Sequence, residues 1–258
     1  MSRVPMMGFN PLPNPALAKT SSAYIGMGDT AENLATRYGI DRATQEAFAL
    51  ASQHKAAAAI AAGKLADEIV PIMTRAGLVD TDGCPRPGTT AEGLAGLKPA
   101  FSATGTVTAG TASPLTDGAS AVLVASEDYA RARGLPILAR IRSTAISGCS
   151  PDIMGIGPVE SSRKALERAG IGVGDLDVVE LNEAFASQAL ACIADLGLDP
   201  AKINLDGGAL ALGHPLGATG ARIVGKAASL LQREGGRFAL ATQCIGGGQG
   251  IATVLEAI

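Results

Sequence analysis

The feature that most limits which folds this chain can adopt is a regular alternation of apolar runs and helical segments between residues 119 and 256. Apolar segments bounded by turn residues predict strands, and amphipathic segments predict helices. The predicted strands are 119–125, 137–147, 177–181, 202–205, 238–242 and 250–256, and the predicted helices are 126–134, 159–169, 183–195 and 217–232. This alternation predicts an α/β fold with a mostly parallel sheet covered by helices on both faces.

The part of the chain before this alternation predicts two helices and several long loops. Asp29 and Glu32 have capping-box spacing, which predicts a short helix that stops near Gly39. Asp41 is placed to cap a long helix that runs through Ala62. The remaining segments are an ordered Pro-rich loop over 1–28, an alternating strand over 68–75 and a structured excursion over 76–116.

Composition excludes several classes of protein. The chain has 258 residues with a net charge of −3 and no long run of one sign, so no nucleic-acid or membrane-surface partner is expected. No apolar stretch reaches the length of a membrane span. The four cysteines lack paired spacing, which predicts reduced thiols, a cytoplasmic or organelle-matrix setting, and no metal site.

Three polar residues follow three of the predicted strands. Asn182, His214 and Cys244 each come after an apolar run, and the last two lie in glycine-rich turns. Functional groups of α/β folds gather where strands end and helices begin. We therefore expect all three side chains at one edge of one sheet, where an amide, an imidazole and a thiol provide groups for acyl transfer.

Asn182 and Glu183 have two interpretations each. As the N-cap of the next helix, Asn182 would accept hydrogen bonds from exposed N–H groups, which is the more common role of a lone Asn. Its amide could instead position a water or bind an oxyanion. Glu183 could orient that network, or could favour the helix N-terminus electrostatically.

His214 lies between glycines and is followed by Pro215. A buried, hydrogen-bonded core histidine is the usual role of such a residue, but the surrounding small residues favour a position in a pocket. There a neutral imidazole could activate a thiol and donate a hydrogen bond to a thioester oxygen.

Cys244 precedes three consecutive glycines, Gly246 to Gly248. Their N–H groups could form an anion-binding nest and lower the pKa of the thiol. The alternatives are a hairpin turn that needs positive φ angles, and a phosphate loop, although the residues of a P-loop are missing. Cys149 and Cys192 are expected to be small hydrophobic fillers.

Taken together, these segments resemble the thiolase family, which makes or cleaves 3-ketoacyl-CoA thioesters. The resemblance rests on Asn182-Glu183-Ala184-Phe185, the glycine-rich segment around Gly213-His214-Pro215, and Cys244-Ile245-Gly246-Gly247-Gly248. Thr30-Ala31-Glu32-Asn33 and residues 105–110, followed by Ala112-Ser113, also match. The resemblance to the family extends over the entire chain.

The resemblance implies a role for each of these groups. His214 would activate the nucleophilic cysteine, and Asn182 would hold a water that completes the first oxyanion site. Cys244 would be the general acid/base, and the Gly246 N–H would belong to the second oxyanion site. Coenzyme A would be a substrate, with no other cofactor. The residues implied to line its tunnel are Met27, Arg86, Ala109, Ser113, Ala184 and Phe185.

The resemblance also implies the architecture, a layered thiolase-like βαβαβαββ α/β fold plus a loop domain. Residues 1–113 would be the loop domain over coenzyme A, 114–136 a remnant of the N-terminal core, and 137–258 the complete C-terminal domain. About the first third of the family chain, including the nucleophilic cysteine, is expected upstream of residue 1. The resemblance further implies assembly as a homodimer or homotetramer.

Several positions depart from the family pattern. Thr111 stands where Asn is usual, Gly93 replaces a frequent Ser, and Gly26 occupies a position that is often His in acetoacetyl-CoA-forming members. Leu181 and Gln249 look more like the degradative thiolases that act on longer substrates. None of the four cysteines, Cys84 included, has the sequence context of the nucleophile.

Three functions stay open at this point. The first is a thiolase that acts by ping-pong acyl transfer. The second is a non-catalytic coenzyme A-binding relic or partial subunit. The third is a Claisen-condensing synthase of the same wider fold. Cys244 argues against the synthase, because decarboxylating condensation does not require this second cysteine.

Overall fold

The computed structural model describes residues 13–258, and its central element is a four-stranded sheet in the order β3-β6-β5-β4. The strands are β3 (Arg140–Gly148), β4 (Val178–Leu181), β5 (Phe238–Ile245) and β6 (Gln249–Glu256). β4 pairs with β5 in parallel, whereas β6 is antiparallel to both β3 and β5. The α/β prediction is confirmed, but the mostly parallel sheet is wrong, because the β5–β6 hairpin places an antiparallel strand in the middle.

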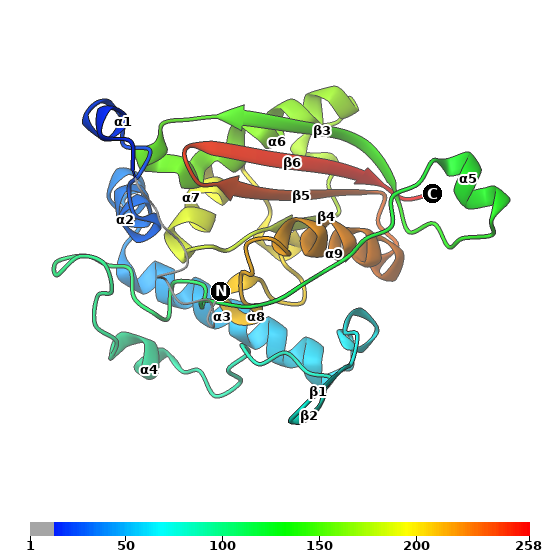
Figure 1. Cartoon of the computed structure of the whole chain (residues 1–258), viewed down its shortest axis with the longest axis horizontal. Coiled ribbons are helices and arrows are strands. Elements are labelled where there is room, and N and C mark those ends of the chain that lie inside the picture. The colour runs from blue at the N-terminus through cyan, green and yellow to red at the C-terminus, as the bar shows by residue number, and fades with distance from the viewer. Residues whose placement is uncertain (1–12) are drawn as a thin grey trace.

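Helices cover both faces of this sheet, as the sequence predicts (Figure 1). One face packs on α6 (Gly157–Ala169) and α7 (Ala186–Leu196) through a core that includes Val179, Leu181 and Leu240. The other face packs on α9 (Thr219–Glu234) through residues such as Val178 and Ala239. Successive strand residues point to opposite faces, so strands buried on both sides read as continuous apolar runs.

The first half of the described chain lies against this layered unit. The helices here are α1 (Pro15–Thr20), α2 (Met27–Tyr38), α3 (Arg42–Ala61), α4 (Ala91–Ala95) and α5 (Glu127–Ala132), and the strands are β1 (Ile72–Thr74) and β2 (Gly77–Val79). The other short helical segments are η2 (Ala66–Glu68), η3 (Pro151–Ile156), η4 (Val173–Asp175), η5 (Pro200–Lys202) and α8 (Ala209–Leu212). Figure 1 shows α3 running beneath the sheet, with the β1–β2 hairpin beyond its end.

The structure corrects two predictions for the first 75 residues and confirms a third. The predicted loop over 1–28 contains the helix α1, and its part before residue 13 lies outside the described residues. The predicted strand over 68–75 is shorter, because only residues 72–74 pair, in a hairpin with residues 77–79. The Asp41 cap is confirmed, since its carboxylate accepts a hydrogen bond from Thr44 N at 2.7 Å.

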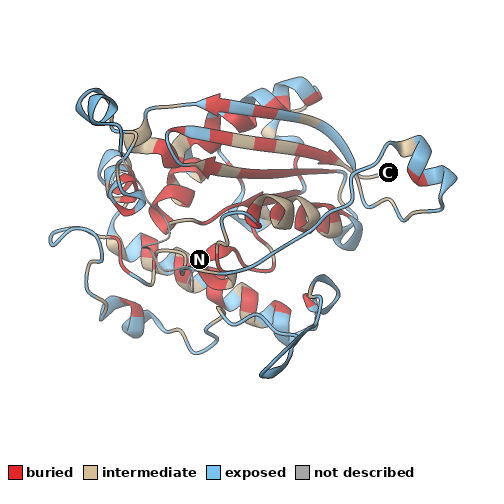
Figure 2. Ribbon diagram, in the orientation of Figure 1, coloured by how far each residue is buried: buried red, intermediate tan, exposed pale blue. Residues whose placement is uncertain are grey.

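The predicted strand over 119–125 is also wrong. The segment is extended, but among the described residues it joins no sheet, and Leu123 and Val124 are 79% and 68% exposed. Figure 2 shows this connection toward α5 as mostly exposed, in contrast to the buried central strands. A strand requires a neighbour to bond with, and an apolar pattern alone does not supply one.

The predicted strand over 202–205 is replaced by a single bridge and a side-chain contact. Ile203 forms an isolated parallel bridge with Val179. The Asn204 side chain then accepts from Leu181 N at 3.0 Å and donates to Leu181 O at 2.9 Å. An Asn amide has the same donor and acceptor as a peptide, so it takes the place of strand backbone here.

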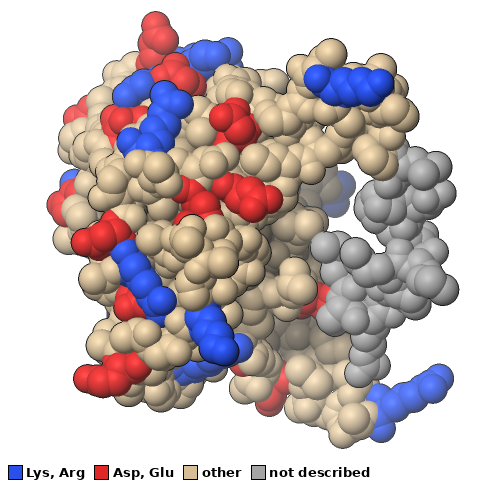
Figure 3. Space-filling model, turned by 90° about the vertical axis from the view of Figure 1, so that its left-hand side faces the viewer, with Lys and Arg blue, Asp and Glu red and all other residues tan. Residues whose placement is uncertain are grey.

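Charged side chains of both signs are intermingled on the face shown in Figure 3. This mixed surface agrees with the net charge of −3. No helix among residues 13–258 is long and apolar enough to cross a membrane.

Candidate active site

Asn182 and His214 are in direct contact at the end of β4. Asn182 N donates to Thr242 O at 3.0 Å, which continues the pairing of β4 with β5 by one residue. The Asn182 side chain then turns toward the loop between α8 and α9, where its Nδ2 lies 3.3 Å from His214 Nε2. The expectation that these two side chains share one edge of the sheet is confirmed.

The alternative in which Asn182 caps the next helix is wrong. α7 begins at Ala186, with Phe185 at the N-cap position. Residues 182–185 cannot start the helix, because Asn182 is held to β5 and Ala186 N donates to Thr111 O at 2.9 Å. The Asn182 side chain is therefore free to serve the site.

One atom of this pair lacks a partner. Asn182 is 1% exposed, and its Oδ1 accepts no hydrogen bond from any described residue. A buried carbonyl oxygen without a donor costs about 1–3 kcal/mol, so such atoms are rare unless a water or ligand serves them. Asn182 Oδ1 is thus the atom here that can accept a hydrogen bond from a water or a substrate.

His214 is half-buried and is held at both ring nitrogens. Its Nδ1 lies 2.6 Å from Thr219 Oγ1 at the start of α9, and Asn182 contacts Nε2. Burial lowers the pKa of His214, and the positive charge of Arg222 lowers it further. The imidazole is therefore neutral near pH 7, which is the form that can accept a proton.

Cys244 lies in β5, next to the strand that carries Asn182, and it is only 8% exposed. Burial raises the pKa of its thiol to about 12, so the predicted lowering of that pKa is wrong. Desolvation disfavours a thiolate, and its cost exceeds the stabilisation by nearby N–H groups. No hydrogen bond joins the Cys244 thiol to His214 or Asn182 within residues 13–258.

The glycines after Cys244 form the turn of the β5–β6 hairpin. Gly247 and Gly248 have φ angles of 86° and 94°, which confirms the hairpin interpretation. A Cβ on Gly248 would overlap Cys149 O, while a Cβ on Gly246 would lie 3.9 Å from Met27 Sδ. The turn therefore brings Met27, predicted as a tunnel residue, next to Gly246.

Arg86 and Ala109, two of the residues implied to line the tunnel, border the same cavity. This cavity has a volume of about 210 Å³ and is also bordered by Gln53, Cys84 and Gly93. Gln53 Oε1 accepts from Arg86 N at 2.9 Å, which fixes the Arg86 backbone on α3.

Ser113, Ala184 and Phe185 lie side by side. Ser113 N donates to Ala184 O at 3.0 Å, and Phe185 stacks edge-on against Phe101 with ring centroids 5.8 Å apart. The segment before α7 is thus pinned to the loop around residue 113. This contact joins the predicted loop domain to the Asn182 segment.

Glu183 is buried and holds three segments together. Its carboxylate accepts from Ser52 Oγ at 2.7 Å, Asn204 Nδ2 at 2.7 Å and Leu210 N at 3.2 Å. Burial raises the pKa of this carboxyl group, and these donors oppose the rise. Glu183 therefore connects α3 and the β4–α7 segment to the first turn of α8, which precedes His214.

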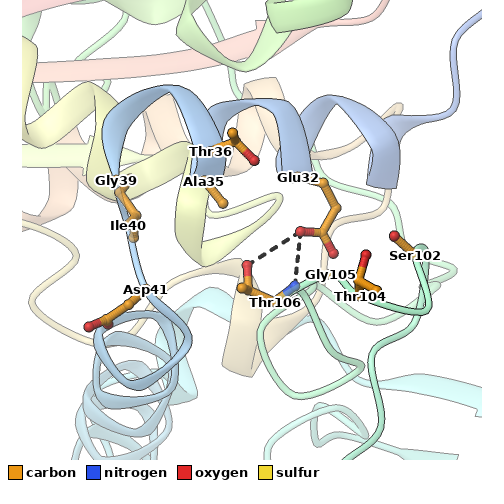
Figure 4. Close-up of a pocket in the computed structure, with 10 residues that line it drawn as sticks. All are labelled: Glu32, Ala35, Thr36, Gly39, Ile40, Asp41, Ser102, Thr104, Gly105 and Thr106. Atoms are coloured by element: carbon orange, nitrogen blue, oxygen red, sulfur yellow. Dashed lines mark hydrogen bonds between the residues drawn. The ribbon is translucent and has the colours of Figure 1, made fainter.

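Glu32 supports the loop that leads to Ala109 and Ser113 (Figure 4). Its carboxylate accepts from Thr106 N and Val107 N at 3.0 Å each, beside a cavity of about 380 Å³. The predicted capping box is wrong, because Gly26 is the N-cap of α2. The spacing of Asp29 and Glu32 was a local signal, whereas the actual partners of Glu32 lie more than 70 residues away.

Sequence reasoning did not identify Thr219, Ser52 or Asn204 as part of this site. Ser52 and Asn204 contact Glu183 from distant segments, and nothing in the sequence near them signals that contact. Thr219 could have been found, because it lies five residues after His214 at the start of a predicted helix.

Comparisons with known proteins identify the family that the chain matches. Residues 12–128 match the family model for the N-terminal domain of thiolase, and residues 135–257 match the model for its C-terminal domain. The chain is 56% identical over 234 residues to an acetyl-CoA acetyltransferase of Paracoccus denitrificans, covering 89% of this chain and 60% of that protein. It is 51% identical over 268 residues to a 3-ketoacyl-CoA thiolase of Aliivibrio fischeri, covering 99% and 68%.

A solved structure shows the same fold. Human mitochondrial 3-ketoacyl-CoA thiolase in complex with CoA matches with a TM-score of 0.89 and 43% identity, over 99% of this chain and 67% of that chain. The chain thus spans about 60% of the length of the Paracoccus protein and 68% of the Aliivibrio protein.

Proposed function

We propose, because this chain belongs to the thiolase family, that it provides the acid/base and thioester-binding part of an acyl-CoA C-acyltransferase. The reaction would be the reversible cleavage of a 3-ketoacyl-CoA by coenzyme A, with acetyl-CoA as one product. A cysteine thiolate takes the acyl group and then passes it to coenzyme A, in ping-pong order. The names of the relatives support this proposal and include both acetyl-CoA acetyltransferase and 3-ketoacyl-CoA thiolase.

The observation that carries the proposal is the Asn182–His214 pair with its unpartnered Asn182 Oδ1. A neutral His214 can accept the proton of an attacking thiol. Once protonated, it can donate a hydrogen bond to the thioester oxygen, where negative charge develops. A water held by Asn182 Oδ1 would be the second donor to that oxygen. This arrangement supports an oxyanion site.

Cys244 and Gly246 support the proton transfer to the departing acetyl-CoA. A thiol with a pKa of about 12 is protonated at neutral pH and is a proton donor at rest. In cleavage, the departing acetyl-CoA enolate needs a proton at its α-carbon, and Cys244 would supply it beside the Gly246 N–H. The degradative direction that we propose rests on Leu181 and Gln249, which look more like the residues of degradative thiolases.

The expected substrate contacts are those of coenzyme A and its pantetheine arm. Arg86 and Ala109 line the 210 Å³ cavity, and Met27 lies beside Gly246. Ser113, Ala184 and Phe185 border the Asn182 segment. We propose coenzyme A as a substrate, no further cofactor, and assembly as a homodimer or homotetramer, which light scattering would measure.

The test is thiolysis of acetoacetyl-CoA and of longer 3-ketoacyl-CoA by the purified chain. His214→Ala should lower the rate by about 10²- to 10⁴-fold, the usual contribution of a positioned acid/base. His54→Ala is the matched control, because His54 is exposed on α3 and should leave the rate unchanged. Equal rates for wild type and His214→Ala would refute the proposed role.

A second function, binding of coenzyme A without acyl transfer, is favoured by one observation. No cysteine thiol among the described residues forms a hydrogen bond with the His214 ring. Calorimetry with coenzyme A separates the two functions, since binding without thiolysis supports the second and turnover supports the first. If the chain shows neither binding nor turnover, both functions are ruled out. If it catalyses condensation with malonyl-CoA but no thiolysis, it is a synthase.

A further inference from the structure

The hydroxyl group of Thr219 determines which nitrogen of His214 carries the proton. Thr219 is fully buried at the first position of α9, and its Oγ1 lies 2.6 Å from His214 Nδ1. The same hydroxyl donates to Pro215 O at 3.1 Å. A hydroxyl has one hydrogen to donate, so toward His214 it acts as an acceptor. His214 Nδ1 must then carry the hydrogen.

The other ring nitrogen leads independently to the same assignment. Asn182 Nδ2, an amide nitrogen, lies 3.3 Å from His214 Nε2. An amide nitrogen only donates, so Nε2 must accept and must carry a lone pair. In neutral imidazole one nitrogen carries hydrogen and the other does not, and the hydrogen-bond partners decide which. Both contacts therefore select the form with hydrogen on Nδ1.

We propose that Thr219 is a positioning residue that holds neutral His214 with its hydrogen on Nδ1, so that Nε2 presents its lone pair toward Asn182. The role of this proton position in acyl transfer rests on the proposed function. The S–H bond of the attacking cysteine thiol breaks, and its proton forms a bond with Nε2 in place of the hydrogen bond from Asn182 Nδ2. The electron pair of the S–H bond stays on sulfur as the thiolate. The resulting imidazolium keeps its Nδ1–H on Thr219 and gains an Nε2–H for the thioester oxygen.

A purely structural role for Thr219 makes a different prediction. If the hydroxyl served only to bond Pro215 O, its removal would loosen the start of α9 and leave the His214 proton where it is. Thr219→Val keeps the shape of the side chain and removes the hydroxyl. Thr219→Ser keeps the hydroxyl and removes a methyl group. The pair therefore separates the hydrogen bond to His214 from packing.

The experiment is long-range ¹H–¹⁵N NMR of the histidine rings in the ¹⁵N-labelled chain at about pH 8, above the ordinary histidine pKa of about 6.5. The chain has only two histidines, and exposed His54 is the internal reference, assigned with His54→Gln. We expect wild type and Thr219→Ser to show hydrogen on Nδ1 of His214. In Thr219→Val the ratio of the two neutral forms should shift toward Nε2–H by about 5- to 10-fold, the factor for one lost buried hydrogen bond.

Two results would overturn the inference: hydrogen on Nε2 in the wild-type chain, or an unchanged ratio in folded Thr219→Val. If Thr219→Val does not fold by circular dichroism, the wild-type and Thr219→Ser spectra still decide. No substrate is used, so the outcome is independent of acyl transfer. A chain with hydrogen on Nδ1 and no thiolysis would keep this inference and refute the proposed function.

Discussion

The Ser52 hydroxyl connects α3 to the segment that precedes His214, and Ser52→Ala measures how much that connection stabilises the fold. Ser52 Oγ donates to Glu183 Oε2 at 2.7 Å and accepts from Gly208 N at 3.0 Å. Both partners are buried, and Ser52 itself is 3% exposed. Alanine removes one oxygen atom and leaves the surrounding packing nearly unchanged.

The expected cost is the sum of two effects. Gly208 N–H is left buried without an acceptor, which costs about 1–3 kcal/mol, and the carboxylate loses one donor, worth about 1.5–3 kcal/mol. Gly208 has little room to move, because a Cβ built on it would overlap the Glu183 carboxyl group. We therefore expect a loss of about 2.5–6 kcal/mol, which lowers the Tm by roughly 5–24 °C for a chain of this size.

Urea unfolding followed by far-ultraviolet circular dichroism is the suitable assay, because the chain contains no tryptophan for fluorescence. Ser102→Ala is the control, since Ser102 is exposed and should change stability by less than about 0.5 kcal/mol. A loss below about 1 kcal/mol in Ser52→Ala would show that the Gly208 N–H finds another acceptor, and the reasoning would be refuted.

Two further substitutions test the hairpin turn and a buried carboxyl group. In urea unfolding, Gly248→Ala should destabilise the fold by about 1–3 kcal/mol more than Gly39→Ala. Both glycines have positive φ, but only a Cβ added at Gly248 would overlap backbone, at Cys149 O. Equal losses in the two variants would contradict this. Burial raises the pKa of Glu180 to about 8 from 4.5, so the folded state binds its proton more tightly and stability falls as pH rises between these values. Glu180→Gln should remove this decrease in the free energy of unfolding, which amounts to about 5 kcal/mol above pH 8. If the urea midpoint of Glu180→Gln falls with pH as steeply as that of the wild type, the prediction is wrong.

The sequence predicts those parts of the structure that depend on local pattern. β4 to β6 and α6, α7 and α9 all occur within a few residues of their predicted positions. Their apolar pattern is contained in each segment's own residues, so it predicts the element without knowledge of the distant segments that pack on it. The position of Asn182 at the end of β4 follows from the same pattern.

What could not be predicted depends on partners that are distant in the sequence. Leu123 and Val124 belong to a segment with strand composition, yet it joins no sheet in the described part of the chain. Glu32 has the spacing of a cap but bonds Thr106 and Val107 instead. The pKa of Cys244 likewise depends on how deeply the fold buries it, which the neighbouring glycines do not reveal.

The replacement of a strand by the Asn204 side chain has a consequence for how the protein meets other molecules. β4 is the last strand in the order β3-β6-β5-β4, and exposed strand edges are templates for aggregation. Asn204 occupies both the N–H and the C=O of Leu181, and its own N–H bonds Val179 O at 2.9 Å. That edge is therefore closed to an incoming strand, and the backbone and side chain of one Asn protect the sheet against edge-to-edge self-association next to Asn182.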